Sequence, residues 1–419
     1  MLPTFLPTRY LLNPRARQGG PSDDAGTEIL SREAADAAFR EISSWREYAP
    51  TPLRSLDGLA RRLGLDSLLY KDEASRLDLG SFKALGGPYG VLGVLFSHLR
   101  EEEGVEAPSS RALRSGRYAH LLDEVTVTCA STGNHGRAVA LGARLFGCRS
   151  VVFLPSGTAP DRVEAIREVG ARVIPVDGSY DDAVARAARE AEERGWYVVS
   201  DTAYPGYVEV PARIMRGYTV MVREVLQELS GDTPSIDGSG PDTRSTDRRT
   251  DVRLPTHVFL QAGVGGMAAA VSGYLREALG PRCPVTVVVE PDEADCLFEC
   301  ALAGAPGPSR GSLETSMSCL ACREASILAW PILEISADAF LTLPDPAVAD
   351  TVRLLETGTA NDPPIRSRPS GVAGLAGLMA SLMEPTLSGP LGLGADSRVL
   401  VFGTEGPGPG SDPTRKDES

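Results

Sequence analysis

The apolar positions of the chain follow two different spacings. Short apolar and β-branched runs are typical of buried parallel strands, and they occur at residues 68–70, 125–130, 150–155, 172–176, 196–200, 257–261, 285–289 and 399–402. Segments with apolar residues three and four positions apart predict amphipathic helices, and these lie at residues 31–45, 56–63, 137–146, 160–169, 181–194 and 214–229. Strands that alternate with helices predict a parallel sheet with crossover helices, and so an α/β fold.

The order of these elements places one α/β unit inside another. The outer unit is interrupted after a helix that starts near Ser81, and it resumes near residue 215. We therefore expect a large domain formed by residues 1–90 and 215–419, and a small domain formed by residues 91–214. Four segments rich in Pro, Gly or polar residues predict a loose arm, a loop, a disordered surface insertion and a disordered tail, at residues 1–30, 101–117, 230–253 and 407–419.

The composition narrows the class of protein. The chain has 419 residues and a formal net charge of −14, and 42% of its residues are hydrophobic, which is enough for a sizeable core. The acidic balance argues against binding to nucleic acid or to an anionic membrane. No apolar run reaches the roughly 18 residues that suggest a membrane span. The N-terminus lacks a basic segment followed by an apolar one, so no signal peptide is expected.

The cysteines indicate a reducing compartment. All seven are irregularly spaced, which is typical of buried thiols in a cytoplasmic protein and not of a disulfide framework. Cys319 and Cys322 form a Cys-x-x-Cys pair, but a zinc site would need a second pair or two histidines. The chain has four scattered histidines. We therefore expect a cytoplasmic protein without a metal site.

Lys83 is the first candidate for chemistry. It follows the strand at 68–70 and a polar loop, and it falls in the first turn of a helix for which Ser81 is a plausible N-cap. The positive end of the helix dipole, together with burial, would lower the pKa of an amine there. A neutral amine can form an imine with an aldehyde. Taken alone, this stretch is better explained by a solvated lysine at a helix start, and only further signals along the chain reverse that preference.

A glycine-rich loop at residues 263–266 lies between a strand and a helix that ends at Leu279. Small residues let backbone N–H groups converge on a phosphate at the start of a helix. Because Met267 and Ala268 follow, the loop is not Gly-x-Gly-x-x-Gly, and it lacks the Lys-Ser/Thr of a P-loop, so nucleotide binding is disfavoured. Tight packing is the alternative explanation.

Two further turns follow strands of the predicted sheets. Residues 131–136 include Asn134, whose amide is suited to a phenolic oxygen on a cofactor ring; the alternative is a helix-capping turn. Thr404 follows the last strand, at the edge where ligands bind in open α/β sheets. Its hydroxyl could meet a ring nitrogen, and the alternative is a plain turn.

In this order, the signals resemble those of the fold type II pyridoxal phosphate enzymes, the group of tryptophan synthase β and threonine dehydratase, and among them most of all the diaminopropionate ammonia-lyases. The resemblance extends from about residue 50 to residue 406, apart from the insertion, and its distinctive stretches are 81–87, 133–137, 201–207, 261–267, 289–296 and 404–406. The Asp-Thr-Ala at 201–203 and the Glu-Pro-Asp-x-Ala-Asp-Cys at 290–296 favour the ammonia-lyases over the general dehydratases.

The resemblance implies a fold of two domains, each a mostly parallel twisted sheet flanked by helices, with pyridoxal 5'-phosphate in the cleft between them. The implied reaction is α,β-elimination of a small amino acid, 2,3-diaminopropionate, to pyruvate and ammonia, and the implied assembly is a homodimer.

The resemblance also implies a role for each site residue. Lys83 would be the Schiff-base lysine and the base at Cα, and Asp201 would lie near the substrate amine. Asn134 would bond the phenolic oxygen. Thr404 would face the pyridine nitrogen and keep the ring unprotonated, which suits elimination. The phosphate would be held by Gly263, Val264, Gly265, Gly266 and Met267.

Two departures from the ammonia-lyase pattern bear on the substrate. Thr132 stands where that family has an aspartate that resembles a second base, and threonine cannot act as a base near neutral pH. We therefore expect activity confined to the L-isomer, or a different substrate. Residues 322–325 read Cys-Arg-Glu-Ala where the family tends to have Cys-Gly-Glu-Pro, which puts substrate recognition by that loop in doubt. Cys296 and Cys322 could pair, although a reducing cytoplasm favours free thiols.

Two alternative functions remain open at this point. One is a pyridoxal phosphate enzyme that performs elimination, dehydration or β-replacement on another β-substituted amino acid of the serine or threonine kind, and Thr132 supports it. The other is a cofactor-binding protein that has lost catalysis. Retention of Lys83 and of the glycine loop argues against the second alternative, and an assay distinguishes the two.

Overall fold

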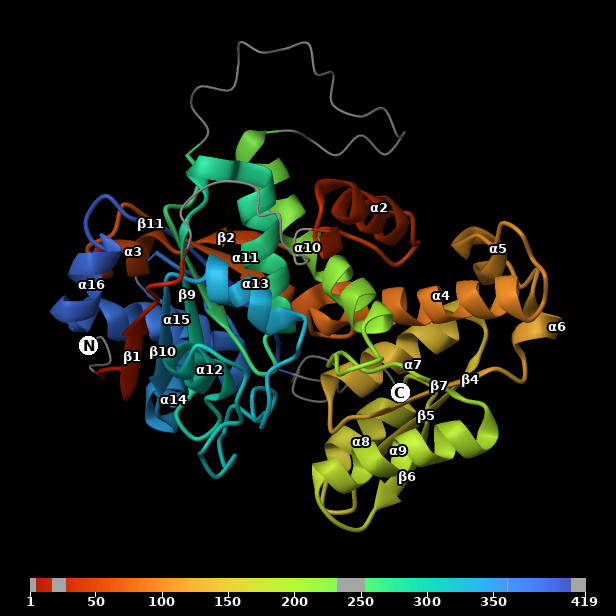
Figure 1. Ribbon diagram of the computed structural model, residues 1–419. Coiled ribbons are helices and arrows are strands. Elements are labelled where there is room, and N and C mark those ends of the chain that lie inside the picture. Colours follow the sequence, from red (N-terminus) through yellow and green to blue (C-terminus); the bar gives the residue numbers. More distant parts are fainter. Residues whose placement is uncertain (1–4, 17–27, 232–252, 360, 408–419) are drawn as a thin grey trace, which may run out of the picture.

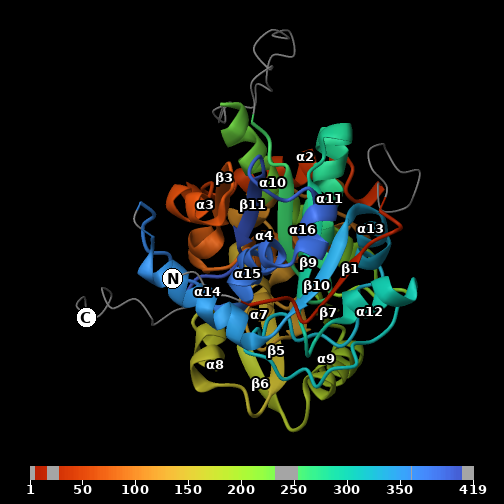
Figure 2. The ribbon, with the colours of Figure 1, turned by 90° about the vertical axis from the view of Figure 1, so that its left-hand side faces the viewer.

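The computed structural model describes residues 5–16, 28–231, 253–359 and 361–407, and these form two sheets in separate bodies of the molecule (Figures 1 and 2). The larger sheet runs β1 (Arg9–Leu12), β10 (Ala339–Leu343), β9 (Val285–Pro291), β8 (His257–Gln261), β11 (Arg398–Gly403), β3 (Ser67–Asp72) and β2 (Leu53–Ser55). The smaller sheet runs β6 (Arg172–Val176), β5 (Arg149–Pro155), β4 (Thr126–Ala130) and β7 (Tyr197–Val198).

Parallel pairing dominates both sheets. In the larger sheet β10, β9, β8, β11 and β3 pair in parallel, whereas the edge strands β1 and β2 pair antiparallel to their neighbours. The described strands of the smaller sheet are all parallel. A parallel sheet is usually covered on both faces, which explains why the fully buried strands β8 and β10 are rich in apolar residues. The predicted α/β fold is therefore confirmed.

Helices connect the strands and pack around the sheets (Figure 1). They are α2 (Arg32–Ser43), α3 (Asp57–Leu63), α4 (Lys83–Glu101), α5 (Ser110–Arg114), α6 (Ala119–Leu122), α7 (Asn134–Phe146), α8 (Pro160–Arg167), α9 (Tyr180–Arg194), α10 (Glu209–Ser230), α11 (Gly266–Leu279), α12 (Cys296–Ala303), α13 (Ala329–Ser336), α14 (Asp345–Thr357), α15 (Pro369–Met383) and α16 (Pro385–Leu391), with the short 3-10 helices η1 (Glu73–Asp78) and η2 (Gly280–Arg282).

Three of these helices, α4, α7 and α10, pack tightly where the two bodies meet (Figure 1). A Cβ added at Gly87 of α4 would lie 2.5 Å from the Cβ of Ala138 on α7, and one added at Gly86 would lie 2.5 Å from the Tyr218 ring on α10. A side chain larger than hydrogen would therefore force the helices apart. The two glycines fix the position of α4, and Lys83 is the first residue of that helix.

The structure differs from the sequence-based expectation in several elements. The loop expected at 101–117 contains α5, which is capped by the hydroxyl of Ser109, and the loose arm contains β1, which pairs with β10. The insertion and the tail that the sequence predicts to be disordered fall mainly at 232–252 and 408–419, outside the described residues. The domain boundaries stay a prediction. Within the described part of the chain, no helix combines the length and apolarity needed to cross a membrane.

A buried charge network joins β3 and η1 to α10. The carboxylate of Glu224 accepts hydrogen bonds from Lys71 Nζ at 2.6 Å and from two nitrogens of Arg76, each at 2.7 Å. Arg76 Nε also donates to Glu73 at 2.8 Å, and Glu73 accepts from the hydroxyl of Thr51 at 2.6 Å. Because both cations and both carboxylates are buried, each charge depends on the others for the solvation that water would give.

Replacing Glu224 by alanine is expected to lower the free energy of unfolding by about 3–5 kcal/mol, because Lys71 and Arg76 would be left buried without their shared partner. Urea unfolding measures the change. The control is Glu228→Ala, which removes an exposed carboxylate one turn later on α10. A loss at Glu224 no larger than that of the control would contradict the importance of the network.

Candidate active site

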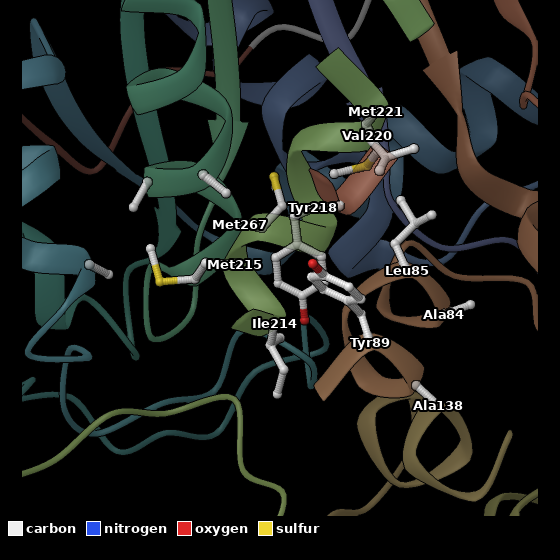
Figure 3. Close-up of a cluster of buried hydrophobic side chains, with 14 of the residues drawn as sticks. Ala84, Leu85, Tyr89, Ala138, Ile214, Met215, Tyr218, Val220, Met221 and Met267 are labelled. Carbon is white, nitrogen blue, oxygen red and sulfur yellow. The ribbon is translucent and has the colours of Figure 1, made fainter. Parts of the chain in front are cut away.

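Lys83 lies at the centre of the candidate site. Lys83 is the first residue of α4, and the preceding Phe82 gives no side-chain cap. The backbone N–H of Lys83 donates a long hydrogen bond of 3.4 Å to the hydroxyl of Ser81. Lys83 Nζ forms a short contact with the carboxylate of Asp201. It also lies 5.9 Å from the ring centroid of Tyr218, which packs in the core with Tyr89, Met215, Met221 and Met267 (Figure 3). The lysine is thus in the first turn of a helix, as predicted.

The protonation of Lys83 is the opposite of what its position on the helix suggests. Burial alone would lower the pKa of Lys83, but the charge of Asp201 and the hydrogen bond to it outweigh burial and raise the pKa above its ordinary value. Burial would likewise raise the pKa of Asp201, but His135 and Lys83 hold it below its usual range. The expectation that the pKa of Lys83 is lowered was therefore wrong. The sequence did not reveal the contact with Asp201, because that residue lies 118 positions away along the chain.

His135 is a neighbour of Asp201 to which the motif gave no role. Its Nε2 lies 2.8 Å from the carbonyl oxygen of Val199, which can only accept, so Nε2 carries the proton. Nδ1 is buried without a hydrogen-bond partner and lies 3.8 Å from Asp201 Oδ2. Burial lowers the pKa of His135, while the charge of Asp201 opposes that shift. Nδ1 is the ring nitrogen that faces the Lys83–Asp201 pair.

The glycine loop has the form of an anion cradle. Gly265 adopts a left-handed conformation with φ of 93°, and α11 begins at the next residue with no side-chain cap. The first backbone N–H groups of a helix have no intrahelical partner, so they are available to a phosphate. A Cβ on Gly263 would lie 2.8 Å from the sulfur of Cys322, so a larger residue would crowd the loop.

Thr404 directly follows β11, and its hydroxyl already accepts one hydrogen bond. Gln261 Nε2 donates to Thr404 Oγ1 at 2.8 Å and also to two backbone carbonyls. Because the hydroxyl accepts from Gln261, its own hydrogen is left to donate to another acceptor. An unprotonated ring nitrogen is such an acceptor, so Thr404 fits its predicted place.

Asn134 lies at the start of α7 and is joined to the other body. Its Nδ2 donates to Glu405 Oε2 at 2.6 Å, and the thiol of Cys319 donates to the same oxygen at 3.1 Å. Nδ2 also donates to the sulfur of Cys319 at 3.7 Å. A phenolic oxygen would therefore take the place of this weak sulfur contact. Thr132 lies two residues earlier and is half-buried.

Several residues of the site were not assigned a role from the sequence. His135, Gln261 and Glu405 lie inside the motifs that carry the resemblance, and their burial next to a candidate residue is the signal that identifies them. Tyr218 had no motif, and only the packing of α10 on α4 reveals it. All seven cysteines are free thiols, Cys296 and Cys322 included.

The residues present fit pyridoxal phosphate. The site offers an amine for the aldehyde, a helix start without a side-chain cap for the phosphate, a hydroxyl with a free hydrogen for the ring nitrogen, and an amide for the phenolic oxygen. These four groups come from four distant parts of the chain, and each matches one functional group of the cofactor.

Comparisons with known proteins agree with this fit. The family model "Pyridoxal-phosphate dependent enzyme" matches residues 45–402. Diaminopropionate ammonia-lyase of Escherichia coli strain K12 is 37% identical over 381 residues, which cover 90% of this chain and 89% of that protein. The protein of the same name from Salmonella typhimurium strain LT2 is 35% identical over 405 residues, which cover 95% of each. The crystal structure of the holo Escherichia coli enzyme superposes with a TM-score of 0.80 at 33% identity, over 96% of this chain and 94% of that one.

Proposed function

The chain belongs to the pyridoxal-phosphate dependent enzyme family, and from that premise we propose that it is an ammonia-lyase acting on 2,3-diaminopropionate. The products are pyruvate and two molecules of ammonia, and one molecule of water is consumed. The observation that carries the proposal is the contact of Lys83 with Asp201 at the start of α4, in a chain more than a third identical to the Escherichia coli ammonia-lyase along most of its length.

Each residue of the site has a distinct task in the proposed reaction. When bound, pyridoxal phosphate supplies the electron sink beside Cα of the amino acid. The start of α11 would bind the phosphate, Thr404 would donate to the ring nitrogen, and Asn134 would donate to the phenolic oxygen. Lys83 Nζ takes the proton from Cα, and Asp201 stabilises the ammonium that this transfer creates.

The test is the release of a 2-oxo acid by purified holoenzyme: pyruvate from L- or D-2,3-diaminopropionate and from L-serine, and 2-oxobutanoate from L-threonine. The four amino acids are offered side by side, and the visible absorption of the cofactor is recorded in each case. We expect 2-oxo acid from the L-diamine at a rate well above that from either hydroxy amino acid. A coloured protein that releases nothing from any of the four would refute the proposed substrate while leaving the family intact.

A second candidate function is elimination or β-replacement on another β-substituted amino acid. Thr132 favours it, because this residue replaces a carboxylate that the ammonia-lyases resembling this chain carry. Turnover of O-substituted serines in the absence of any diaminopropionate activity would support this candidate.

The stereochemical preference follows from the same residue. If Lys83 is the only base that reaches Cα, the L-isomer alone is turned over. Thr132→Asp is expected to raise the rate with the D-isomer by about tenfold or more, because a carboxylate can accept the proton from the opposite face. The ratio of D- to L-isomer rates measures the effect. The control is Thr132→Asn, because asparagine has the shape of aspartate but cannot act as a base. This variant should leave the ratio unchanged.

The proposal also covers the cellular compartment, the oligomeric state and the domain division of the enzyme. Seven free thiols are typical of a reducing compartment, which supports the cytoplasm. The homodimer and the two-domain division rest on the resemblance to the ammonia-lyases, and the mass of the native protein in solution tests the dimer.

A further inference from the structure

A cleft that opens to solvent lies beside Asn134, outside the group of residues around Lys83. It encloses about 470 Å³ of empty space, part of which is open to solvent, and it is lined by α7, α8, the segment at Cys319 and the turn after β11. Three guanidinium groups line it, those of Arg137, Arg162 and Arg368. Because Asn134 and Glu405 line the same cleft, it adjoins the candidate active site.

Arg137 is the unusual residue of this cleft. It is only 9% exposed, and its Nε is buried without a hydrogen-bond partner. Among the described residues, no carboxylate forms an ion pair with it, whereas the buried Arg76 is paired with two. Arginine is rarely buried unless it is paired, and an unpaired buried charge is costly. A partner for Arg137 is therefore to be sought among molecules that enter the cleft.

Arg368 adds to the positive charge at the same place. Its side chain is 33% exposed, and its Nε lies 4.0 Å from Glu405 Oε1. Burial lowers the pKa of Arg137 and the charge of Arg368 lowers it further, while Glu168 and Glu405 act in the opposite direction. An anion between the two guanidinium groups would relieve their repulsion.

The other charged groups of the cleft are already engaged or exposed. Arg162 Nη2 donates to the hydroxyl of Ser318 at 2.9 Å. Glu405 Oε2 accepts from Asn134 and Cys319, and Asp161 is exposed. The other oxygen of Glu405, Oε1, lies 4.0 Å from Arg368 Nε and is left to accept from an ammonium group. Two guanidinium groups beside one such carboxylate match the charges of a zwitterionic amino acid.

We propose that Arg137 and Arg368 form a carboxylate-binding subsite at the mouth of the active-site cleft, with Glu405 beside it to receive an ammonium group. The subsite holds a small carboxylate, either the amino acid before it reaches Lys83 or the 2-oxo acid as it leaves. Arg137 lies one turn after Asn134 on α7, so the two side chains lie on the same face of the helix. The choice of ligands rests on the proposed function.

The first test measures binding of pyruvate to the holoenzyme by titration calorimetry, which requires no turnover. Arg137→Gln is expected to raise the dissociation constant about tenfold or more, as befits the loss of a charge-assisted hydrogen bond. Arg144→Gln is the control, because it makes the same change at an exposed position of the same helix. Equal binding of pyruvate by the wild type and by Arg137→Gln, together with an unchanged KM in the kinetic test that follows, would overturn the proposal.

A kinetic test separates the two sources of the carboxylate. If the subsite receives the substrate, Arg137→Gln raises KM for 2,3-diaminopropionate about tenfold and changes kcat by less than about twofold, because Arg137 is away from the reacting atoms. If the subsite receives only the product, Arg137→Gln changes the dissociation constant of pyruvate but leaves KM for 2,3-diaminopropionate unchanged. Pyruvate binding that depends on Arg137 in a protein that turns over no diamine would refute the proposed function and leave the subsite standing.

Thermal unfolding of the same variants checks for a merely structural effect. Without ligand, Arg137→Gln is expected to be at least as stable as the wild type, because it removes an unpaired buried charge. Pyruvate should raise the Tm of the wild type and of Arg144→Gln, but not that of Arg137→Gln. If Arg137→Gln does not fold, Arg368→Gln replaces it, and an unchanged dissociation constant for pyruvate and an unchanged KM in that variant would overturn the proposal.

Discussion

Replacing Lys83 by alanine is expected to lower the rate of pyruvate release from 2,3-diaminopropionate by at least about a thousandfold. The change removes both the amine that anchors the cofactor and the base that takes the Cα proton, and loss of a general base alone costs about a hundredfold to ten-thousandfold. A coupled assay for pyruvate measures the rate, and the visible absorption spectrum shows whether cofactor is retained.

The matched variant is Lys83→Arg. It keeps the positive charge beside Asp201, but a guanidinium stays protonated and cannot form the imine or act as the base. We expect it to be as inactive as the alanine variant while retaining more of the wild-type stability. Activity of either variant within about tenfold of the wild type would rule out Lys83 as the base.

A chemical label gives an independent check on Lys83. The chain has three lysines, at positions 71, 83 and 416. Reduction of the holoenzyme with borohydride should fix the cofactor to one of them, and peptide mass spectrometry identifies which. Lys71 is buried and paired with Glu224, so it is a poor competitor. Label at any position other than Lys83 would contradict the assignment.

The second large effect is expected at Asp201. Asp201→Asn keeps the shape of the side chain but removes its charge, so the ammonium that forms on Lys83 during proton transfer loses its partner. We expect kcat to fall by about a hundredfold, a typical size for a group that assists proton transfer. A fall smaller than that of the control variant Asp181→Asn, an exposed position on α9, would remove Asp201 from the mechanism.

The same variant makes a prediction about pH. Asp201 raises the pKa of Lys83 against the effect of burial, so Asp201→Asn should lower that pKa. Because Lys83 must be neutral to accept a proton, the acid limb of the kcat profile should move to lower pH in the variant. A merely structural role for Asp201 would lower kcat at all pH values without moving the limb.

The site combines a rigid frame with a charge pair that can change state. Lys83 is held by the contact of Gly86 and Gly87 with the neighbouring helices, and the loop before it is held by the network of Arg76 and Glu224. Lys83 itself lies between Asp201 and the ring of Tyr218. A fixed backbone with a mobile proton is the arrangement that acid–base chemistry requires.

The sequence by itself determined the fold class, most of the strands and the cofactor. β6 and β8 are found at the residues that their apolar runs predict, and α9 begins within one residue of its expected start. The glycine loop was recognisable because the strand, the turn and the helix that form it are adjacent in sequence. Strand and helix periods, and the conformations that glycine permits, are properties of neighbouring residues, so they can be read locally.

Only the tertiary structure decided which charges meet. The direction of the Lys83 pKa depends on Asp201, 118 positions away, and the orientation of Asn134 depends on Glu405, 271 positions away. The pairing of β1 with β10 and the isolation of Arg137 in its cleft were equally out of reach. A local pattern reports whether a residue is apolar or at a helix start, but the field and the burial that a side chain meets are sums over residues brought together by the fold.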